Sequence, residues 1–129
     1  KTRKNTISVS CRTLDSWVSS LGIDPQLIGF VKCDVQGWES NVLEGAQHVL
    51  GQHRHIVWQF EVSPKHLEAA GSSLQAFSAR VGRHFERFID VDGDDIADRS
   101  TASLEDSLQY LQADPDHYKF TDILAYNTH

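Results

Sequence analysis

The stretch IGFVKCDVQGWESNVLEGAQHVLGQHRHIVWQFEV, residues 28–62, decides the fold. Its two ends, residues 28–35 and 55–62, are short, apolar and rich in β-branched side chains, a composition typical of buried strands. Between them, apolar side chains recur at the spacing of an amphipathic helix that begins after Gly37 and is expected to end at Gly51. A strand, a helix and a second strand in this order predict two parallel strands joined by a crossover.

Helices and strands of the same kind are expected on both sides of this stretch. Thr13 predicts the N-cap of a helix at residues 14–21, and Ser63 followed by Pro64 predicts the start of a helix that continues to Val81. The other expected elements are strands at residues 6–10, 85–91 and 120–126 and a short helix at residues 104–111 with Ser103 as its cap. The whole order predicts an α/β fold, with one domain over residues 1–129 and flanking helices around a Rossmann-like, mostly parallel sheet.

The composition narrows the class of protein. The chain has 129 residues, of which 40% are hydrophobic and 23% charged, as in an ordinary globular protein. A net charge of -6 argues against a nucleic-acid-binding surface. No apolar run approaches the ~20 residues of a membrane span, and the basic, polar start does not resemble a signal peptide. We therefore expect a cytoplasmic protein in which Cys11 and Cys33 are reduced thiols, with a disulfide as the less favoured alternative.

Charged side chains near the ends of the two strands point to a site. In open α/β sheets, ligands bind beyond the carboxyl ends of the strands. Lys32 and Asp34 share one face of the first strand, and Asp34 lies nearer its tip. Glu61 lies near the end of the second strand, so parallel pairing predicts that Asp34 and Glu61 meet at one rim. Two carboxylates there could abstract a proton, hold a metal or bind a polar substrate, whereas the alternative is ordinary ion pairing and, for Glu39, interaction with a helix dipole.

Other chemistry-bearing patterns favour structural interpretations. His48, His53 and His55 straddle a predicted helix end and strand start, so surface histidines are favoured over a metal site. The acidic segment at residues 90–95 lacks the Gly and the final acid of an EF-hand loop, which favours an acidic turn after a strand. No metal site is therefore expected. The three tryptophans are expected in the core, namely Trp17, Trp38 and Trp58.

The combined spacing of these residues resembles the FkbM family of methyltransferases. The family pattern is a TLD segment, a K-x-D-x-E-G-x-E run, a V-L-x-G-A helix and a strand that ends in Glu. The matching residues are Thr13, Leu14 and Asp15; Lys32, Asp34, Gly37 and Glu39; Val42, Leu43, Gly45 and Ala46; and Phe60 and Glu61. The chain departs from the pattern at Gln36, where the family usually has Glu. An amide keeps the hydrogen-bonding capacity of that position but cannot act as a base.

The resemblance implies an S-adenosylmethionine-dependent methyltransferase that methylates oxygen on a small molecule or a sugar. The implied catalytic residues are Asp34 and Glu61, and the implied substrate-binding or orienting residues are Lys32, Gln36, Gly37 and Glu39. The implied fold is the C-terminal half of a class I methyltransferase. Such enzymes hold the cofactor on a Gly-rich turn, and none is visible before Lys32. The half of the domain that binds the cofactor is therefore expected to be absent, and the chain alone is expected to be inactive.

Two other functions remain open. A non-catalytic remnant would persist as a dimeric or binding module, and Gln36 favours it slightly. A divalent-metal hydrolase built on Asp34, Glu61 and the acidic segment at residues 90–95 has no support from ligand spacing. In a half-domain, the strand from Ile28 to Val35 would become a bare apolar edge, which is a liability. We expect a second copy of the chain, part of a longer polypeptide or a rearranged N-terminus to cover it.

Overall fold

The computed structural model describes residues 5–113 and 119–128, and within them five strands form one sheet in the order β1-β2-β5-β3-β4. The strands are β1 (Phe30–Cys33), β2 (Val57–Val62), β3 (Arg87–Asp90), β4 (Asp98–Ser100) and β5 (Thr121–Tyr126). The helices are α1 (Leu14–Ser20), α2 (Glu39–Glu44), α3 (Gln47–Gln52), α4 (Pro64–Ala69), α5 (Leu74–His84) and α6 (Leu104–Ser107). Three short 3-10 helices are η1 (Pro25–Leu27), η2 (Thr101–Ser103) and η3 (Gln109–Gln112). The α/β character and the flanking helices are thus confirmed.

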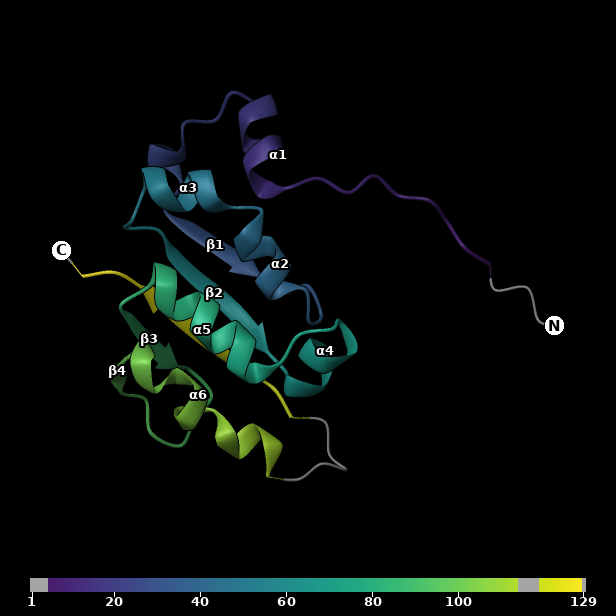
Figure 1. Ribbon diagram of the computed structural model, residues 1–129. Coiled ribbons are helices and arrows are strands. Elements are labelled where there is room, and N and C mark those ends of the chain that lie inside the picture. Colours follow the sequence, from purple (N-terminus) through teal and green to yellow (C-terminus); the bar gives the residue numbers. More distant parts are fainter. Residues whose placement is uncertain (1–4, 114–118, 129) are drawn as a thin grey trace.

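The helices gather on one face of the sheet (Figure 1). The burial of β2 reflects this, because Trp58, Phe60 and Val62 are buried while the alternate residues Val57 and Glu61 are only partly so. Successive side chains of a strand point to opposite faces, so one face packs on the helices and the other lies open. The open face carries the predicted site residues Lys32, Asp34 and Glu61, as the strand register described below requires.

The prediction of a mostly parallel sheet is wrong. The pairing of β1 with β2 is parallel, as expected, but β2 with β5, β5 with β3 and β3 with β4 are all antiparallel. The reason lies in the last connection, where Tyr110 and Thr121 both donate hydrogen bonds to the Asp90 carboxylate at the end of β3. The connection therefore ends beside the carboxyl end of β3. From that point β5 can only run in the direction opposite to its two neighbours, β2 and β3.

Two long helices of the sequence prediction are each broken in two. The break between α2 and α3 falls at Gly45, whose carbonyl accepts a hydrogen bond from the Asp15 N–H (3.0 Å). A Cβ at Gly45 would lie 3.1 Å from the Thr13 side chain, so α1 packs closely on this break. The break between α4 and α5 falls at Gly71, which has a φ of +83°. A left-handed residue ends a helix and is adopted easily only by glycine.

Smaller differences have local causes. Residues 6–10 form no strand and lie in an exposed extended segment, because no other described strand pairs with them. Ser103 makes no capping hydrogen bond; Ser100 instead accepts from the Ala102 N–H at the start of η2. The strand β4 was not anticipated, and α3 continues through Gly51. The caps at Thr13 and Ser63 are confirmed, since each hydroxyl accepts a backbone N–H three residues on.

Aromatic rings fill the core between the sheet and the helices. Trp58 and Phe60 stack with ring centroids 5.6 Å apart, and Phe77 of α5 meets Phe60 edge-on at 5.5 Å. The expectation that all three tryptophans are buried is wrong, because Trp17 is 49% exposed and Trp38 is 54% exposed. Among the described residues, no helix is long and apolar enough to cross a membrane. Both cysteines are free thiols.

Candidate functional site

The carboxyl ends of β1 and β2 bring the two predicted catalytic carboxylates to one rim. Lys32 pairs with Gln59 and Cys33 with Phe60, so Asp34 and Glu61 are the next residues of two parallel neighbours. Paired residues of adjacent strands share a face, which places both carboxylates on the open face of the sheet. Asp34 is exposed and Glu61 is partly buried. Glu61 also lies directly opposite Asp122 of β5, so three acids meet at this rim.

The acidic rim (Asp34, Glu61 and Asp122) gathers three carboxylates, and the charge of His66 offsets part of their effect by lowering the pKa of Glu61. None of the ion pairs among the described residues includes any of the three. Partial burial raises the pKa of Glu61, and the negative charges of Asp34, Asp122 and Glu39 raise that pKa further. In the part of the chain that the structure describes, Asp122 Oδ1 is buried with no hydrogen-bond partner. Like charges opposite one another destabilise a sheet, so the fold does not need this arrangement.

The loop after β1 holds Asp34 in place. Gln36 has a φ of +53°, and its amide nitrogen donates a hydrogen bond to Asp34 Oδ1 (3.1 Å). A left-handed backbone is uncommon for a residue other than glycine, and such strain gathers at functional sites. The amide that replaces the usual Glu therefore supports the Asp34 carboxylate, where a second carboxylate would repel it.

Gly37 and Glu39 shape the same loop from inside the protein. Gly37 has a φ of +102°, and a Cβ there would lie 2.0 Å from the carbonyl oxygen of His66 in α4. Glu39 is only 2% exposed, and its Oε1 accepts hydrogen bonds from the N–H groups of Val35 (3.2 Å) and Gly37 (3.3 Å). In this structure Gly37 allows the loop to pack against α4, and Glu39 fixes the loop backbone. Both therefore act on the rim by positioning it.

The neighbouring charged and nucleophilic groups add little to the rim. Lys32 is exposed on β1 and forms no ion pair within residues 5–113 and 119–128. Burial, followed by the charges of Glu39 and Asp34, raises the pKa of the Cys33 thiol to about 12. A thiol with such a pKa is not a nucleophile near neutral pH.

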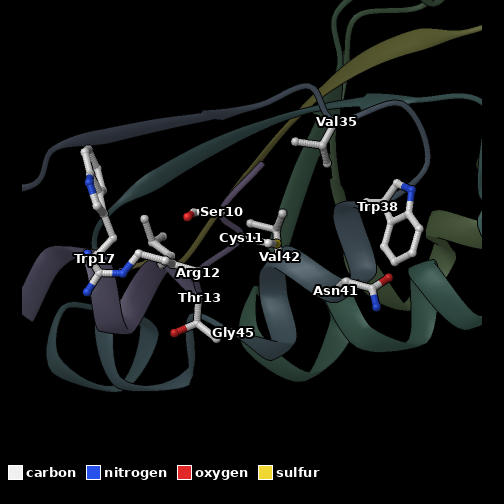
Figure 2. Close-up of a pocket in the computed structure, with 11 residues that line it drawn as sticks. Ser10, Cys11, Arg12, Thr13, Trp17, Val35, Trp38, Asn41, Val42 and Gly45 are labelled. Atoms are coloured by element: carbon white, nitrogen blue, oxygen red, sulfur yellow. The ribbon is translucent and has the colours of Figure 1, made fainter. Parts of the chain in front are cut away.

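A pocket that the sequence did not predict lies on the helix side of the tip of β1. It is a pocket of about 830 Å³ lined by Ser10, Cys11, Arg12, Thr13, Leu14, Trp17, Val35, Trp38, Asn41, Val42 and Gly45. Figure 2 shows Trp17 and Trp38 at opposite ends of the pocket, with Arg12 and Val42 between them. Trp38 precedes the first residue of α2, so the helical stripe does not bury its ring.

The described residues contain no cluster of side chains suited to a metal ion, and their left-handed glycines lie at helix ends or against α4. No group of three or more His, Cys, Asp or Glu side chains among them is arranged to hold a metal ion. Asp90, in the acidic segment, is 4% exposed, and its carboxylate accepts hydrogen bonds from the hydroxyl groups of Tyr110 and Thr121. Because Asp90 ends β3 and Thr121 begins β5, the second of these hydrogen bonds links the two strands. Gly22 and Gly71 follow helices, and Gly37 is packed against α4, so none of these left-handed glycines forms an open Gly-rich turn after a strand.

Comparison with known proteins identifies the family. The sequence model of the Methyltransferase FkbM domain matches residues 1–115. No curated protein and no solved structure matches the chain. The matched range includes β1, the loop that holds Asp34, and Glu61 at the rim. Because the match covers well over half of the sequence, this chain belongs to the FkbM methyltransferase family.

Proposed function

We propose that this chain is the acceptor-side part of an S-adenosylmethionine-dependent methyltransferase that methylates oxygen on a small molecule or a sugar in the cytoplasm. The observation that carries the proposal is the pair Asp34 and Glu61 at adjacent strand tips, with the pKa of Glu61 raised. Clustered carboxylates with a perturbed pKa are typical of functional sites. Free thiols at Cys11 and Cys33 suit a reducing compartment.

The proposed roles follow from the environment of each residue. Glu61 takes the proton from the acceptor hydroxyl, because its raised pKa makes it a better proton acceptor than an ordinary glutamate. Asp34 binds and orients the acceptor, and the Gln36 amide holds Asp34 in place. Glu39 and Gly37 position the loop, and Lys32 is available on the same face to bind a polar substituent.

The methyl group would come from S-adenosylmethionine, whose site the described residues do not complete. In support, Gly37, which follows β1, is packed against the His66 carbonyl of α4 and offers no open turn to a cofactor. The cofactor-binding part is therefore proposed to belong to another segment of a longer polypeptide or to an assembly. In support, β1, β2 and β3 run in one direction, since β2 and β3 are both antiparallel to β5. A run of this kind is compatible with the C-terminal half of a class I methyltransferase sheet.

A complementation experiment tests this function. The chain is mixed with, or fused to, the N-terminal half of an FkbM methyltransferase, and methyl transfer from labelled cofactor to hydroxylated small molecules is measured. Loss of a general base lowers kcat by about 10²–10⁴-fold, so Glu61→Gln should do this, and Asp34→Asn should also raise KM. The matched control is Asp94→Asn, because Asp94 is exposed and lies outside the rim. Full activity of Glu61→Gln in an active complex would contradict the proposed role.

The second candidate is a non-catalytic binding module. The observation in its favour is that several apolar side chains at and just before β1 are exposed, among them Phe30 (52% exposed) and Leu27 (82% exposed). Exposed apolar side chains that lie together would favour a binding interface whether or not the rim is catalytic. A complex that contains the cofactor site but methylates none of the acceptors would favour this candidate.

A further inference from the structure

Asp122 of β5 faces the Glu61 carboxylate across two neighbouring strands. β2 and β5 pair antiparallel, and their register places Glu61 directly opposite Asp122. Thr121 and Ile123, on either side of Asp122, are buried, so Asp122 points to the open face of the sheet. Side chains opposite one another in this way have Cβ atoms about 4.5–5.5 Å apart. A glutamate and an aspartate at this separation can bring their carboxyl groups together.

The backbone of Asp122 brings the two side chains closer still. Its N–H donates a hydrogen bond to Asp92 Oδ2 (3.1 Å), and its C=O accepts one from the Val91 N–H (2.9 Å). Both partners directly follow β3, so the backbone groups of Asp122 point away from β2. Asp122 and Glu61 therefore form a pair without mutual backbone hydrogen bonds, the type in which opposite side chains are closest.

One oxygen of Asp122 lacks a hydrogen-bond donor. Among the residues that the structure describes, Asp122 Oδ1 is buried and has no partner. A buried acceptor without a donor destabilises a fold and calls for an explanation. The neighbours of Asp122 across the sheet are Val91, which has no polar side chain, and Glu61. An ionised glutamate has no proton to donate, whereas a protonated one has. The missing donor is therefore supplied when Glu61 takes a proton.

We propose that Asp122 is a positioning residue for Glu61, a role that rests on the proposed function of Glu61 as the base. When Glu61 takes the proton of the acceptor hydroxyl, it donates that proton in a hydrogen bond to Asp122 Oδ1. In this step the acceptor O–H bond breaks, a new O–H bond forms on Glu61, and the negative charge passes from Glu61 to the acceptor oxygen. The Asp122 carboxylate stabilises the protonated form of the base and so favours removal of the proton.

The charged groups around Glu61 single out Asp122 for this role. Partial burial raises the pKa of Glu61 most, and three negative charges raise it further, those of Asp34, Asp122 and Glu39. The charge of His66 on α4 acts in the opposite direction. Asp34 and Glu39 already accept hydrogen bonds within the loop after β1, whereas Asp122 Oδ1 has none. Asp122 is therefore the carboxylate that is ready to accept the new proton donor.

Carbon NMR of the side-chain carboxyl groups tests the contact in the intact chain, without cofactor. The Asp122 carboxyl signal should move in the same pH step in which Glu61 takes its proton, because two strongly interacting groups titrate as a pair. Asp122→Asn should move the Glu61 step to lower pH, since it removes a negative charge beside Glu61. The matched control is Asp94→Asn, at an exposed position outside the rim, which should leave this step unchanged. An unchanged Glu61 step in Asp122→Asn would overturn the proposal.

Kinetics of the active complex described above test the positioning role. Asp122→Asn should lower kcat about tenfold, the change expected when one hydrogen bond to a charged group is weakened. KM should change little, because Asp122 acts on the base and not on the acceptor, whereas Asp34→Asn is expected to raise KM. The acidic limb of the pH profile of kcat should move to lower pH in Asp122→Asn, which a merely structural defect would not cause. Circular dichroism checks that each variant is folded.

Different variants distinguish a failure of this inference from a failure of the proposed function. If Glu61→Gln lowers kcat while Asp122→Asn changes neither kcat nor its pH profile, Glu61 is the base and Asp122 does not position it. That result would overturn the inference alone. Full activity of Glu61→Gln would overturn the assignment of the base, and the inference with it. A lower kcat in both variants, with the acidic limb moved only by Asp122→Asn, is the result that supports both.

Discussion

Asp15 supplies the helix cap that Ala46 cannot. Ala46 occupies the N-cap position of α3 and makes no side-chain capping hydrogen bond. The Asp15 carboxylate, from the first turn of α1, accepts the N–H groups of His48 (2.8 Å) and Val49 (3.0 Å) instead. These are the second and third residues of α3, which a capping side chain normally serves. The TLD segment and the V-L-x-G-A helix of the family pattern are therefore joined by direct contact.

Substitution of Asp15 should destabilise the protein. Asp15→Ala leaves two N–H groups of α3 without their carboxylate partner, and loss of a cap costs about 0.5–2 kcal/mol in the free energy of unfolding. Urea unfolding followed by circular dichroism measures the difference. Asp94→Ala is the control, because Asp94 is exposed and makes none of the described hydrogen bonds, and its stability should match that of the wild type. Equal stability of the two variants would show that the capping contact contributes nothing.

Gly37 should tolerate no side chain. A Cβ at this position meets the His66 carbonyl oxygen at 2.0 Å, and the φ of +102° is strained for any other residue. Gly37→Ala should therefore destabilise the protein by about 3 kcal/mol or more, as expected when overpacking and backbone strain combine. Gly51→Ala is the matched control, because nothing lies within 4 Å of its Cβ, and should be neutral or stabilising. Thermal unfolding of both variants distinguishes them, and similar melting temperatures would contradict the observed contact.

Glu61 should make stability depend on pH. Because its pKa is raised in the folded protein, the unfolded chain loses this proton first as the pH rises, so folding stability is highest in acid and falls as the pH passes the folded pKa. Glu61→Gln removes the ionisation of this side chain and its repulsion with Asp122. Its free energy of unfolding at pH 7 should therefore exceed that of the wild type by up to about 1 kcal/mol. The difference should vanish below pH 4.5, the ordinary pKa of a glutamate. Urea unfolding at several pH values tests this, and a variant that is less stable at pH 7 would contradict it.

Tyr110 should govern stability in alkali. Burial and then its hydrogen bond to Asp90 raise the pKa of Tyr110 to about 12 from 10.0. The unfolded chain therefore releases the proton first, and the folded state loses stability as the pH rises above 10. Tyr110→Phe should be less stable at pH 7 by about 1.5 kcal/mol, the lower value for a hydrogen bond to a charged group. It should also lose part of the decline in stability between pH 10 and about 12, the ordinary and the folded pKa of Tyr110, and an unchanged decline would show that other groups cause it.

Signals that act over a few residues were predictable from the sequence. The caps at Thr13 and Ser63 depend on the residues beside them, and both formed as expected. The parallel pairing of β1 and β2 followed from the short helical crossover between them, and it placed Asp34 beside Glu61. The proximity of these two carboxylates was therefore accessible without coordinates.

Features decided by distant contacts were not predictable. The direction of β5 depends on where Tyr110 meets Asp90, twenty residues earlier in the chain. The break at Gly45 depends on its contact with Thr13 in another helix. The exposure of Trp17 and Trp38 depends on which layers surround α1 and α2, which periodicity does not reveal. Periodicity finds an apolar face but does not show what packs against it.

The central claim is that this chain carries the acceptor side of the methyltransferase and not the site for its cofactor. Calorimetric titration of the intact chain with S-adenosylmethionine, repeated with S-adenosylhomocysteine, tests this claim most directly. The account predicts no detectable heat of binding, because the described residues offer no open Gly-rich turn. Clear binding with a micromolar Kd would contradict it. The strand tips and the pocket between Trp17 and Trp38 would then form a cofactor site of their own.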